Sequence, residues 1–269
     1  MCRLLAYLGP AMTLESLLFA PEHSLVRQSF APRHQRHGGV NADGFGVGWY
    51  DRSVRPEPAR YRSDRPIWSD RSLASMAGVV RSSAVVAAVR DATPPAPVEE
   101  SGSPPFTAGP WLFAHNGAVE GFAVGAGATL RQRVSPRRQA GIEGASDSAV
   151  VFAMALDALD AGAGPAEALV SAVSGVEAVA PARLNLVLTD GAGVAATCSG
   201  DSMFVLERAG AGQGGDGTTG GMAVVASEPY DDDPAWAPVP DRSVVTVGAG
   251  RVAVRPFASV GAATVAAWT

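Results

Sequence analysis

The sequence opens with Met1-Cys2-Arg3-Leu4-Leu5-Ala6-Tyr7-Leu8-Gly9, so that a cysteine stands directly before a run of mostly apolar residues. The run from Arg3 to Leu8 is typical of a buried strand, and it leads straight out of the cysteine. The residue in second place is small, which favours removal of Met1. We therefore expect Cys2 to become the first residue and to carry both a thiol and a free α-amino group.

A cysteine in this place combines a nucleophile with its own base. An α-amino group titrates near pH ~7.7–8.0, far below a lysine, so it accepts a proton at cellular pH. Thiol and amine on one residue form a nucleophile–base pair, the counterpart of the N-terminal threonine device. The alternative is a buried cysteine that serves as a small hydrophobic residue. The position of Cys2 alone leaves both interpretations open.

The composition narrows the class of protein. The chain has 269 residues, of which 47% are hydrophobic, enough for a sizeable core. Its net charge of −5 argues against a nucleic-acid binder, because such proteins carry a basic surface. The two cysteines, Cys2 and Cys198, make no disulfide framework, and Cys198 is expected in a core strand. No apolar stretch of membrane-spanning length and no signal-peptide pattern occurs, so we expect a cytoplasmic protein without membrane contact.

The predicted elements are strands, then two helices, then strands again. Strands are expected at 3–8, 45–50, 84–90, 111–116, 184–189, 193–199, 202–207, 222–227, 243–247 and 251–257. Helices are expected after caps at Thr13, Ser69 and Ser146, and at 165–179. No strand or helix is expected in 20–44, 51–66 or 94–110. The order lacks regular βαβ alternation, which favours an α+β fold, and residues 1–269, without repeat or linker, are expected to form one domain.

One arginine has the position expected of a substrate-binding residue. Arg90 is expected at the end of a strand, just before a proline-rich loop. Its planar guanidinium presents a fork of donors that suits a carboxylate. The alternative is a surface salt bridge, which is the commoner role of an isolated arginine.

The stretch His115-Asn116-Gly117 follows a hydrophobic strand. The side-chain N–H of Asn116 and the backbone N–H of Gly117 together have the chemistry of an oxyanion hole. The alternative is a hairpin turn, because Asn-Gly is also the favourite dipeptide of such turns.

Two further stretches have the composition of a binding site. Asp147, in Ser146-Asp147-Ser148 at a helix start, has the charge to pair with a substrate ammonium, and the alternative is a plain N-cap aspartate. Residues 41–49 are rich in glycine, which indicates either tight backbone packing or a ligand approached by main chain.

Taken together, and in this order behind Cys2, these stretches resemble the class II (N-terminal nucleophile) glutamine amidotransferase family from residue 2 to about 247. The resemblance implies that Cys2 attacks a γ-glutamyl amide. It implies that Arg90 holds the glutamate α-carboxylate and Asp147 the α-ammonium, and that Asn116 and Gly117 form the oxyanion hole. The implied fold is the four-layer αββα sandwich of two antiparallel sheets found in Ntn hydrolases.

Within this family, the chain is similar to hydrolases that cleave γ-glutamyl hercynylcysteine S-oxide in ergothioneine biosynthesis. The supporting stretches are 1–3, 28–33, 41–44, 104–106, 182–185 and, most distinctively, 226–233. The resemblance implies release of glutamate and hercynylcysteine S-oxide from a small-molecule substrate. No cofactor is expected, and no metal, because no Cys, Asp or Glu accompanies His34 and His37. Two other functions stay open, a glutaminase that supplies ammonia to a partner synthase and an inactive binding protein. The oligomeric state also stays open.

The leaving group carries a trimethylammonium, which acidic and aromatic side chains recognise well. Glu228 and Tyr230 are therefore predicted to bind substrate, with His115 as a further candidate. Asp231, Trp49 and Trp236 are weaker candidates, since residues 231–233 also fit a solvated turn. Arg183 and Asn185 are expected to brace the sheet, with a substrate role as the secondary alternative. Compared with the family pattern, residues 121–145 and 210–221 are expected to be surface insertions, and the chain from about 248 an extra C-terminal tail.

Overall fold

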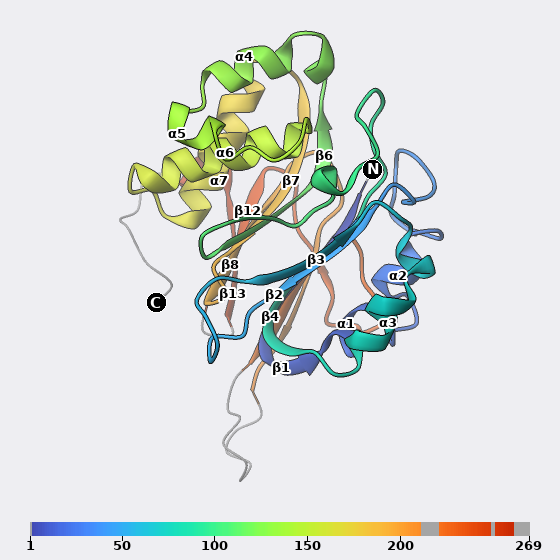
Figure 1. Cartoon of the computed structure of the whole chain (residues 1–269). Helices are drawn as coiled ribbons and strands as arrows, with labels where there is room; N and C mark the ends of the chain where they lie inside the picture. Colours follow the sequence, from blue (N-terminus) through green and yellow to red (C-terminus); the bar gives the residue numbers. More distant parts are fainter. Residues whose placement is uncertain (1, 211–220, 249–250, 261–269) are drawn as a thin grey trace.

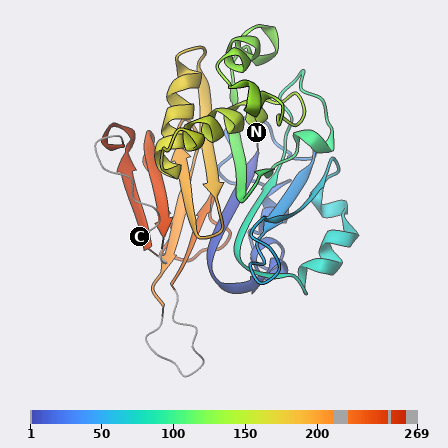
Figure 2. The ribbon, with the colours of Figure 1, turned by 60° about the vertical axis from the view of Figure 1, so that its left-hand side comes forward.

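The computed structural model describes residues 2–210, 221–248 and 251–260. Two antiparallel sheets pack face to face, and each outer face is covered by helices (Figures 1 and 2). The strand order of the first sheet is β11-β9-β10-β1-β4-β2-β3, and that of the second is β13-β12-β8-β7-β6-β5. The predicted α+β class and four-layer αββα sandwich are therefore confirmed.

The elements divide by layer. The first sheet contains β1 (Arg3–Thr13), β2 (Phe45–Trp49), β3 (Ala59–Ser63), β4 (Arg81–Val89), β9 (Phe204–Arg208), β10 (Met222–Ala226) and β11 (Ala237–Pro238). Its outer face carries α1 (Leu14–Leu18), α2 (Leu25–Gln28) and α3 (Arg71–Ala77). The second sheet contains β5 (Phe106–Ala108), β6 (Trp111–Val119), β7 (Ala182–Thr189), β8 (Gly193–Cys198), β12 (Ser243–Gly248) and β13 (Arg251–Pro256). Its outer face carries α6 (Asp147–Asp160) and α7 (Pro165–Glu177), with α4 (Ala126–Gln132) and α5 (Pro136–Gln139) beside them.

The central strand β1 explains why the layers form. Alternate residues point to opposite faces of a strand, so Leu4 and Ala6 pack between the two sheets while Leu5 and Tyr7 pack against α1–α3. All four side chains are about 1% exposed. Because β1 pairs with β10 on one side and β4 on the other, it lies inside the sheet. Cys2 therefore directly precedes the buried half of this central strand.

The helix caps follow the sequence closely. Thr13 caps α1 by accepting from Ser16 N at 3.1 Å, and Ser146 caps α6 by accepting from Ala149 N at 3.2 Å, as predicted. The predicted cap of α3 at Ser69 is wrong by one residue. Asp70 Oδ1 accepts from Leu73 N at 2.8 Å instead, since a carboxylate is also a strong cap.

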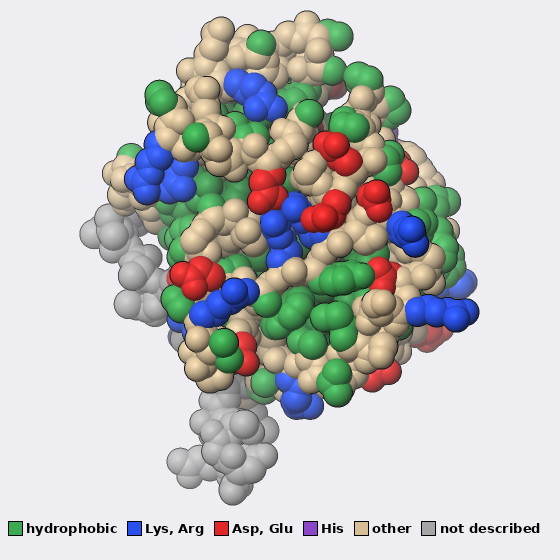
Figure 3. All heavy atoms as spheres, in the orientation of Figure 1, with side chains coloured by type: hydrophobic (Ala, Val, Ile, Leu, Met, Phe, Trp, Pro, Cys, Tyr) green, Lys and Arg blue, Asp and Glu red, His purple; other side chains and the backbone are tan. Residues whose placement is uncertain are grey.

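Several elements were not expected from the sequence, among them α2 within 20–44, β3 within 51–66 and β5 within 94–110. β3 and β5 are edge strands, and β3 is half-buried and carries Arg60 and Arg62. These arginines form ion pairs with Glu100 and Glu143, and Figure 3 shows basic and acidic side chains gathered over β3. Edge strands facing water lack the apolar alternation by which a strand is predicted.

The segments expected to lie outside the family pattern have different structures. Residues 121–145 form α4 and α5, and the expectation of a wholly exposed segment needs correction, because Leu130 and Val134 are buried against α6 and α7. Residues 211–220 of the expected insertion 210–221 lie outside the described residues. After residue 248, β13 pairs with β12 and extends the second sheet. Among the described residues, no helix is long and apolar enough to cross a membrane.

Candidate active site

A cavity of about 590 Å³ lies where β1, β4 and β6 meet the start of α6. It is lined by Cys2, Arg90, His115, Gly117 and Asp147, together with residues of the adjoining loops. β1 and β4 are neighbours, and the pairing of Arg3 with Val89 puts Cys2 next to Arg90. The fold thus gathers at one place residues that are far apart in the sequence.

Cys2 is half-buried and precedes β1. Burial raises the pKa of its thiol. Nearby positive charge, including the Arg90 guanidinium, and the backbone N–H of Asp91 oppose this rise in pKa, while Asp147 adds to it. The thiol is therefore protonated at neutral pH, and it needs a base before it can attack.

Arg90 lies in the wall of the cavity and is only 5% exposed. Its guanidinium donates to Asp43 O at 3.4 Å and to Pro97 O at 3.0 Å. No carboxylate of the described residues forms an ion pair with it, so a surface salt bridge is the wrong interpretation. Gly102 makes room for the guanidinium, since a Cβ there would lie 2.8 Å from Arg90 Nη2. A buried cation held by two carbonyls retains its attraction for an anion in the cavity.

Asn116 and Gly117 lie inside β6, where they pair with Asn185 and Leu184 of β7. The interpretation as a hairpin turn is therefore wrong. A side chain at position 117 is impossible, because a Cβ would lie 1.8 Å from Arg183 O. Gly117 lines the cavity, whereas Asn116 is fully buried one residue behind it and its Nδ2 donates to Ser227 Oγ at 3.4 Å.

Asp147 is the first residue of α6 and faces the cavity. The cap of the helix is Ser146, so the alternative of a plain N-cap aspartate is wrong. Asp147 Oδ2 accepts from Val119 N at 3.0 Å, and Oδ1 accepts from Ser148 N at 2.7 Å. These bonds fix the carboxylate and leave part of its acceptor capacity for a ligand, because each carboxylate oxygen accepts more than one bond.

His115 lines the cavity, but both of its ring nitrogens already have protein partners. Nδ1 lies 3.0 Å from Ser148 Oγ, and Nε2 lies 3.0 Å from Arg183 O. Ser148 Oγ in turn lies 3.2 Å from Asp147 Oδ1. The ring therefore supports the side of the cavity that holds Asp147, and its nitrogens are not left for the substrate.

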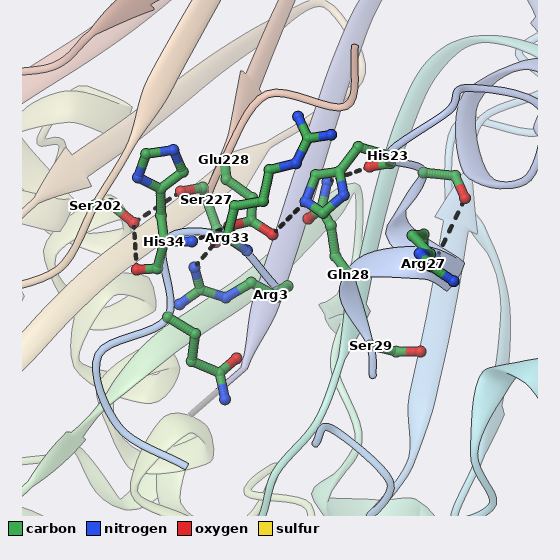
Figure 4. Close-up of polar contacts among 12 residues, drawn as sticks. Arg3, His23, Arg27, Gln28, Ser29, Arg33, His34, Ser202, Ser227 and Glu228 are labelled. Atoms are coloured by element: carbon green, nitrogen blue, oxygen red, sulfur yellow. Dashed lines mark hydrogen bonds and ion pairs between the residues drawn. The ribbon is translucent and has the colours of Figure 1, made fainter. Parts of the chain in front are cut away.

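Glu228 and Tyr230 are not brought to the cavity, and their predicted substrate contact is wrong. Glu228 is 0% exposed; its Oε1 lies 3.0 Å from His23 Nε2, and its Oε2 accepts from the backbone N–H groups of Arg33 and His34 (Figure 4). Tyr230 packs edge-on against Trp236 in the layer of α1–α3. Acidic and aromatic side chains suit a cationic ligand, but an acidic side chain also occurs in a buried hydrogen-bond network and an aromatic one in a hydrophobic core.

The weaker candidates also lie elsewhere, with one exception. Asp231 accepts from Trp236 Nε1 at 2.7 Å, and Trp49 lies on β2. Arg183 does line the cavity, and its Nε lies 3.3 Å from Asp201 Oδ2. Asn185 donates to the carbonyls of Asp201 and Ser202 at 3.0 Å, so it braces β7 as predicted.

Three residues that contact this site were not singled out from the sequence. They are Gly102, Ser148 and Ser227, which support Arg90, Asp147 and Asn116 respectively. Ser227 lies in the distinctive stretch 226–233 and Ser148 in the stretch Ser146-Asp147-Ser148, although neither was given a role of its own. Gly102 is a single glycine whose contact is visible only in three dimensions.

A two-sheet sandwich with a cysteine at the start of its central strand and an Arg–Asn-Gly–Asp set around it defines the class of protein. The family model of class II glutamine amidotransferases matches residues 1–213. The chain belongs to this family.

Two curated relatives match almost the whole chain. Gamma-glutamyl-hercynylcysteine sulfoxide hydrolase of Mycobacterium tuberculosis is 42% identical over 248 residues, covering 92% of this chain and 93% of the relative. The protein of the same name from Mycolicibacterium smegmatis is 40% identical over 258 residues, covering 96% and 100%. Among solved structures, a glutamine aminotransferase class-II domain protein from Silicibacter pomeroyi has a TM-score of 0.66 at 27% identity, covering 95% of this chain and 99% of that one.

Proposed function

We propose that this chain hydrolyses the γ-glutamyl amide bond of γ-glutamyl hercynylcysteine S-oxide and releases glutamate and hercynylcysteine S-oxide. The observation that carries the proposal is the single cavity that holds Cys2, Arg90, Gly117 and Asp147. The activity named for the two relatives supports the choice of substrate. The absence of a membrane-spanning helix among the described residues fits action on a small molecule in the cytoplasm.

Cys2 acts as nucleophile after Met1 has been removed. Its own α-amino group takes the thiol proton, directly or through a water, and the thiolate attacks the γ-carbonyl carbon. The carbonyl oxygen becomes an oxyanion, which the Gly117 N–H and the Asn116 amide stabilise. Losing one such donor typically lowers the rate by ~10²–10³.

The breakdown of the tetrahedral intermediate uses the same amine as an acid. The Cys2 ammonium protonates the amide nitrogen, the C–N bond breaks, and the leaving amine departs while a thioester remains on Cys2. A water, deprotonated by the Cys2 amine, then attacks the thioester carbonyl. Glutamate leaves, and the proton returns to the thiol.

Arg90 and Asp147 hold the two charged ends of the glutamyl group. The guanidinium receives the α-carboxylate in a bidentate pair, and the Asp147 carboxylate receives the α-ammonium. Both side chains are fixed by hydrogen bonds to the backbone, so they are ordered before the substrate arrives. Such positioning places the γ-carbonyl over Cys2 and lowers the entropic cost of attack.

The size of the cavity favours a leaving group larger than ammonia. Its volume of about 590 Å³ falls within the ~300–1,000 Å³ typical of sites for drug-sized ligands. Beyond the four residues Cys2, Arg90, Gly117 and Asp147, the lining includes residues 93–97 and residues 120–124. They give the cavity a mainly apolar extension that glutamine alone leaves empty.

A glutaminase that passes ammonia to a partner synthase is the second candidate, because the same residues would bind glutamine. The test compares glutamate release by the mature protein from the sulfoxide substrate, its thioether analogue and glutamine. We expect kcat/KM for the sulfoxide to exceed that for glutamine by at least about tenfold, equivalent to ~1.4 kcal/mol of leaving-group binding in the transition state. Equal or faster turnover of glutamine would favour the glutaminase.

An inactive binding protein is the third function left open by the sequence. Its hallmark is a retained Met1, which blocks the amine of Cys2. Intact-mass measurement of the purified protein distinguishes the two states, and we expect the mass of the chain without Met1. A homogeneous chain with Met1 that releases no glutamate would favour the binding protein.

A further inference from the structure

The dipeptide Ser227-Glu228 follows β10 and contacts the beginning of the nucleophile strand β1. Ser227 N donates to Leu4 O at 3.0 Å, and Leu4 N donates to Ser227 Oγ at 3.0 Å. The side-chain hydroxyl thus takes the place of a backbone acceptor, and the ladder between β1 and β10 continues past the last regular pair, Leu5 and Ala226. Leu4 is only two residues from Cys2, so Ser227 fixes the base of the nucleophile.

The same hydroxyl reaches the other sheet. Ser227 Oγ accepts from Asn116 Nδ2 at 3.4 Å, and both residues are at most 1% exposed. Asn116 lies on β6 of the second sheet, whereas Leu4 lies on β1 of the first. An amide nitrogen carries two N–H donors. The N–H that donates to Ser227 Oγ holds the plane of the Asn116 amide in place, and the second N–H is left for the oxyanion.

Glu228 acts on the other side of Cys2, through Arg3. Arg3 Nε donates to the Cys2 carbonyl at 2.8 Å, and Arg3 Nη1 lies 4.0 Å from Glu228 Oε2. Both side chains are 0% exposed, and a buried charge is costly without a partner. Burial lowers the pKa of Arg3, and Glu228 opposes that effect. Figure 4 shows Arg3 beside the carboxylate of Glu228.

Glu228 is held firmly by its other contacts. The two N–H groups of Arg33 and His34 donate to Oε2 at 2.9 and 2.6 Å, and His23 engages Oε1. The carboxylate is therefore an anchor with fixed position, and it acts on Arg3 through the 4.0 Å ion pair, since Arg3 Nη1 and Nη2 make no hydrogen bond among the described residues. Ser227 and Glu228 are adjacent, so one rigid dipeptide braces the nucleophile from both sides and the oxyanion amide as well.

We infer that Ser227-Glu228 is a positioning pair that sets the location of the Cys2 thiol relative to the oxyanion hole. Neither residue touches substrate. The pair acts in the transition state, because the distance from thiol to carbonyl carbon and from amide to oxyanion matters most there. This inference rests on the proposed function, because the turnover of that substrate is what the first test measures. The positioning of Cys2 itself should matter for the reaction with any γ-glutamyl electrophile.

The main test is Ser227→Ala, with Ser82→Ala as matched control. Ser82 is also a buried strand serine, whose Oγ donates to backbone carbonyls of Tyr50 and Ala84 far from the cavity. We expect Ser227→Ala to lower kcat about 10–100-fold, somewhat less than loss of an oxyanion donor, with KM changed less than about twofold. Ser82→Ala is expected to lose comparable thermal stability while kcat stays within twofold of wild type. Equal kcat in the two variants would overturn the inference.

A double-mutant cycle separates positioning from general loosening. If Ser227 acts on catalysis through Asn116, the fall in kcat caused by Ser227→Ala shrinks to less than about threefold in an Asn116→Ala background. Independent, multiplicative losses would contradict that coupling.

A second readout keeps the inference apart from the choice of substrate. Labelling of Cys2 by the γ-glutamyl diazoketone 6-diazo-5-oxo-L-norleucine, followed by intact mass, needs the nucleophile and glutamyl site but no hercynyl group. We expect the labelling rate of Ser227→Ala to fall at least about fivefold below that of Ser82→Ala. If wild type is labelled but does not turn over the sulfoxide, the proposed function fails while the labelling rates still decide the inference. A wild-type protein that is neither labelled nor active would overturn both.

Discussion

Asp147 and Glu228 are two carboxylates with opposite surroundings, although the sequence predicts substrate binding for both. Asp147 is half-buried at a helix start, faces the cavity beside Cys2, and accepts from the backbone N–H groups of Val119 and Ser148. Glu228 is fully buried behind the nucleophile strand and is enclosed by Arg3, His23 and two backbone N–H groups. The comparison teaches that the partners of a charged residue, rather than its type, separate a binding group from a brace.

The cavity and the network behind it therefore have different sensitivities. Substitutions at the cavity are expected to change chemistry and binding while the fold survives, because these groups retain unused capacity for a ligand. Substitutions in the network are expected to change stability as well, because its charged groups are fully desolvated. The following variants test that division.

The largest effect is expected for Cys2→Ala. Without the thiol no thioester forms, so glutamate release should fall to background. The side chain is half-buried at the end of β1, and we expect the thermal midpoint to stay within a few degrees of wild type. Measurable wild-type rates in this variant would remove Cys2 as nucleophile.

Arg90→Lys is expected to follow. A lysine keeps the charge but loses the planar fork, so it cannot hold a carboxylate through two parallel bonds. A charge-assisted hydrogen bond contributes ~1.5–3 kcal/mol, which corresponds to a fall in kcat/KM of roughly 10–100-fold. Steady-state kinetics would show it, and unchanged kcat and KM would place Arg90 outside the binding site.

Asp147→Asn and Glu228→Gln should behave as opposites. Asp147→Asn is expected to raise KM about tenfold or more, through loss of the ammonium partner, with little change in stability. Glu228→Gln leaves the Arg3 charge buried without its carboxylate, so the free energy of unfolding should fall by about 3 kcal/mol or more. Urea unfolding and kinetics measured on the same preparations check both. A stability loss of equal size in the two variants would break the comparison.

The smallest effect is expected for the second cysteine. Cys198 is 2% exposed between the sheets, and burial raises the pKa of its thiol to about 12. A raised pKa means that almost none of the thiol is ionised at pH 8, and the thiolate is the reactive form. Burial raises the pKa of the Cys2 thiol too, but Cys2 lines the open cavity. Iodoacetamide at pH 8 should therefore alkylate Cys2 and spare Cys198, and Cys198→Ala should leave kcat within twofold of wild type. Peptide mapping that finds faster alkylation at Cys198 would contradict this.

The elements predicted correctly from the sequence are those with a physical signature along the chain. β1 and β4 are continuous apolar runs because both faces are buried, and α6 begins at a serine cap. β3 was missed because an edge strand facing water is polar and rich in arginine. The spacing of apolar residues along the sequence predicts an element because burial imposes that spacing. The prediction fails for an element that is not buried.

The site divides in the same manner. Cys2, Arg90, Gly117 and Asp147 converge on one cavity, which the order of motifs along the chain anticipated. Glu228 was assigned to substrate because a buried anchoring carboxylate and a binding carboxylate look alike in sequence. Gly102 acts only through its contact with Arg90 across the fold, and such a contact leaves no local pattern.

The central claim is that Cys2, freed of Met1, forms a glutamyl thioester in this cavity. The most direct measurement is intact-mass spectrometry of the wild-type protein, acid-quenched during turnover of γ-glutamyl hercynylcysteine S-oxide, followed by mapping of the modified peptide. We predict a chain lacking Met1 and carrying one glutamyl group on the peptide that begins with Cys2. Turnover by a chain that retains Met1, or a glutamyl group attached elsewhere, would contradict the account.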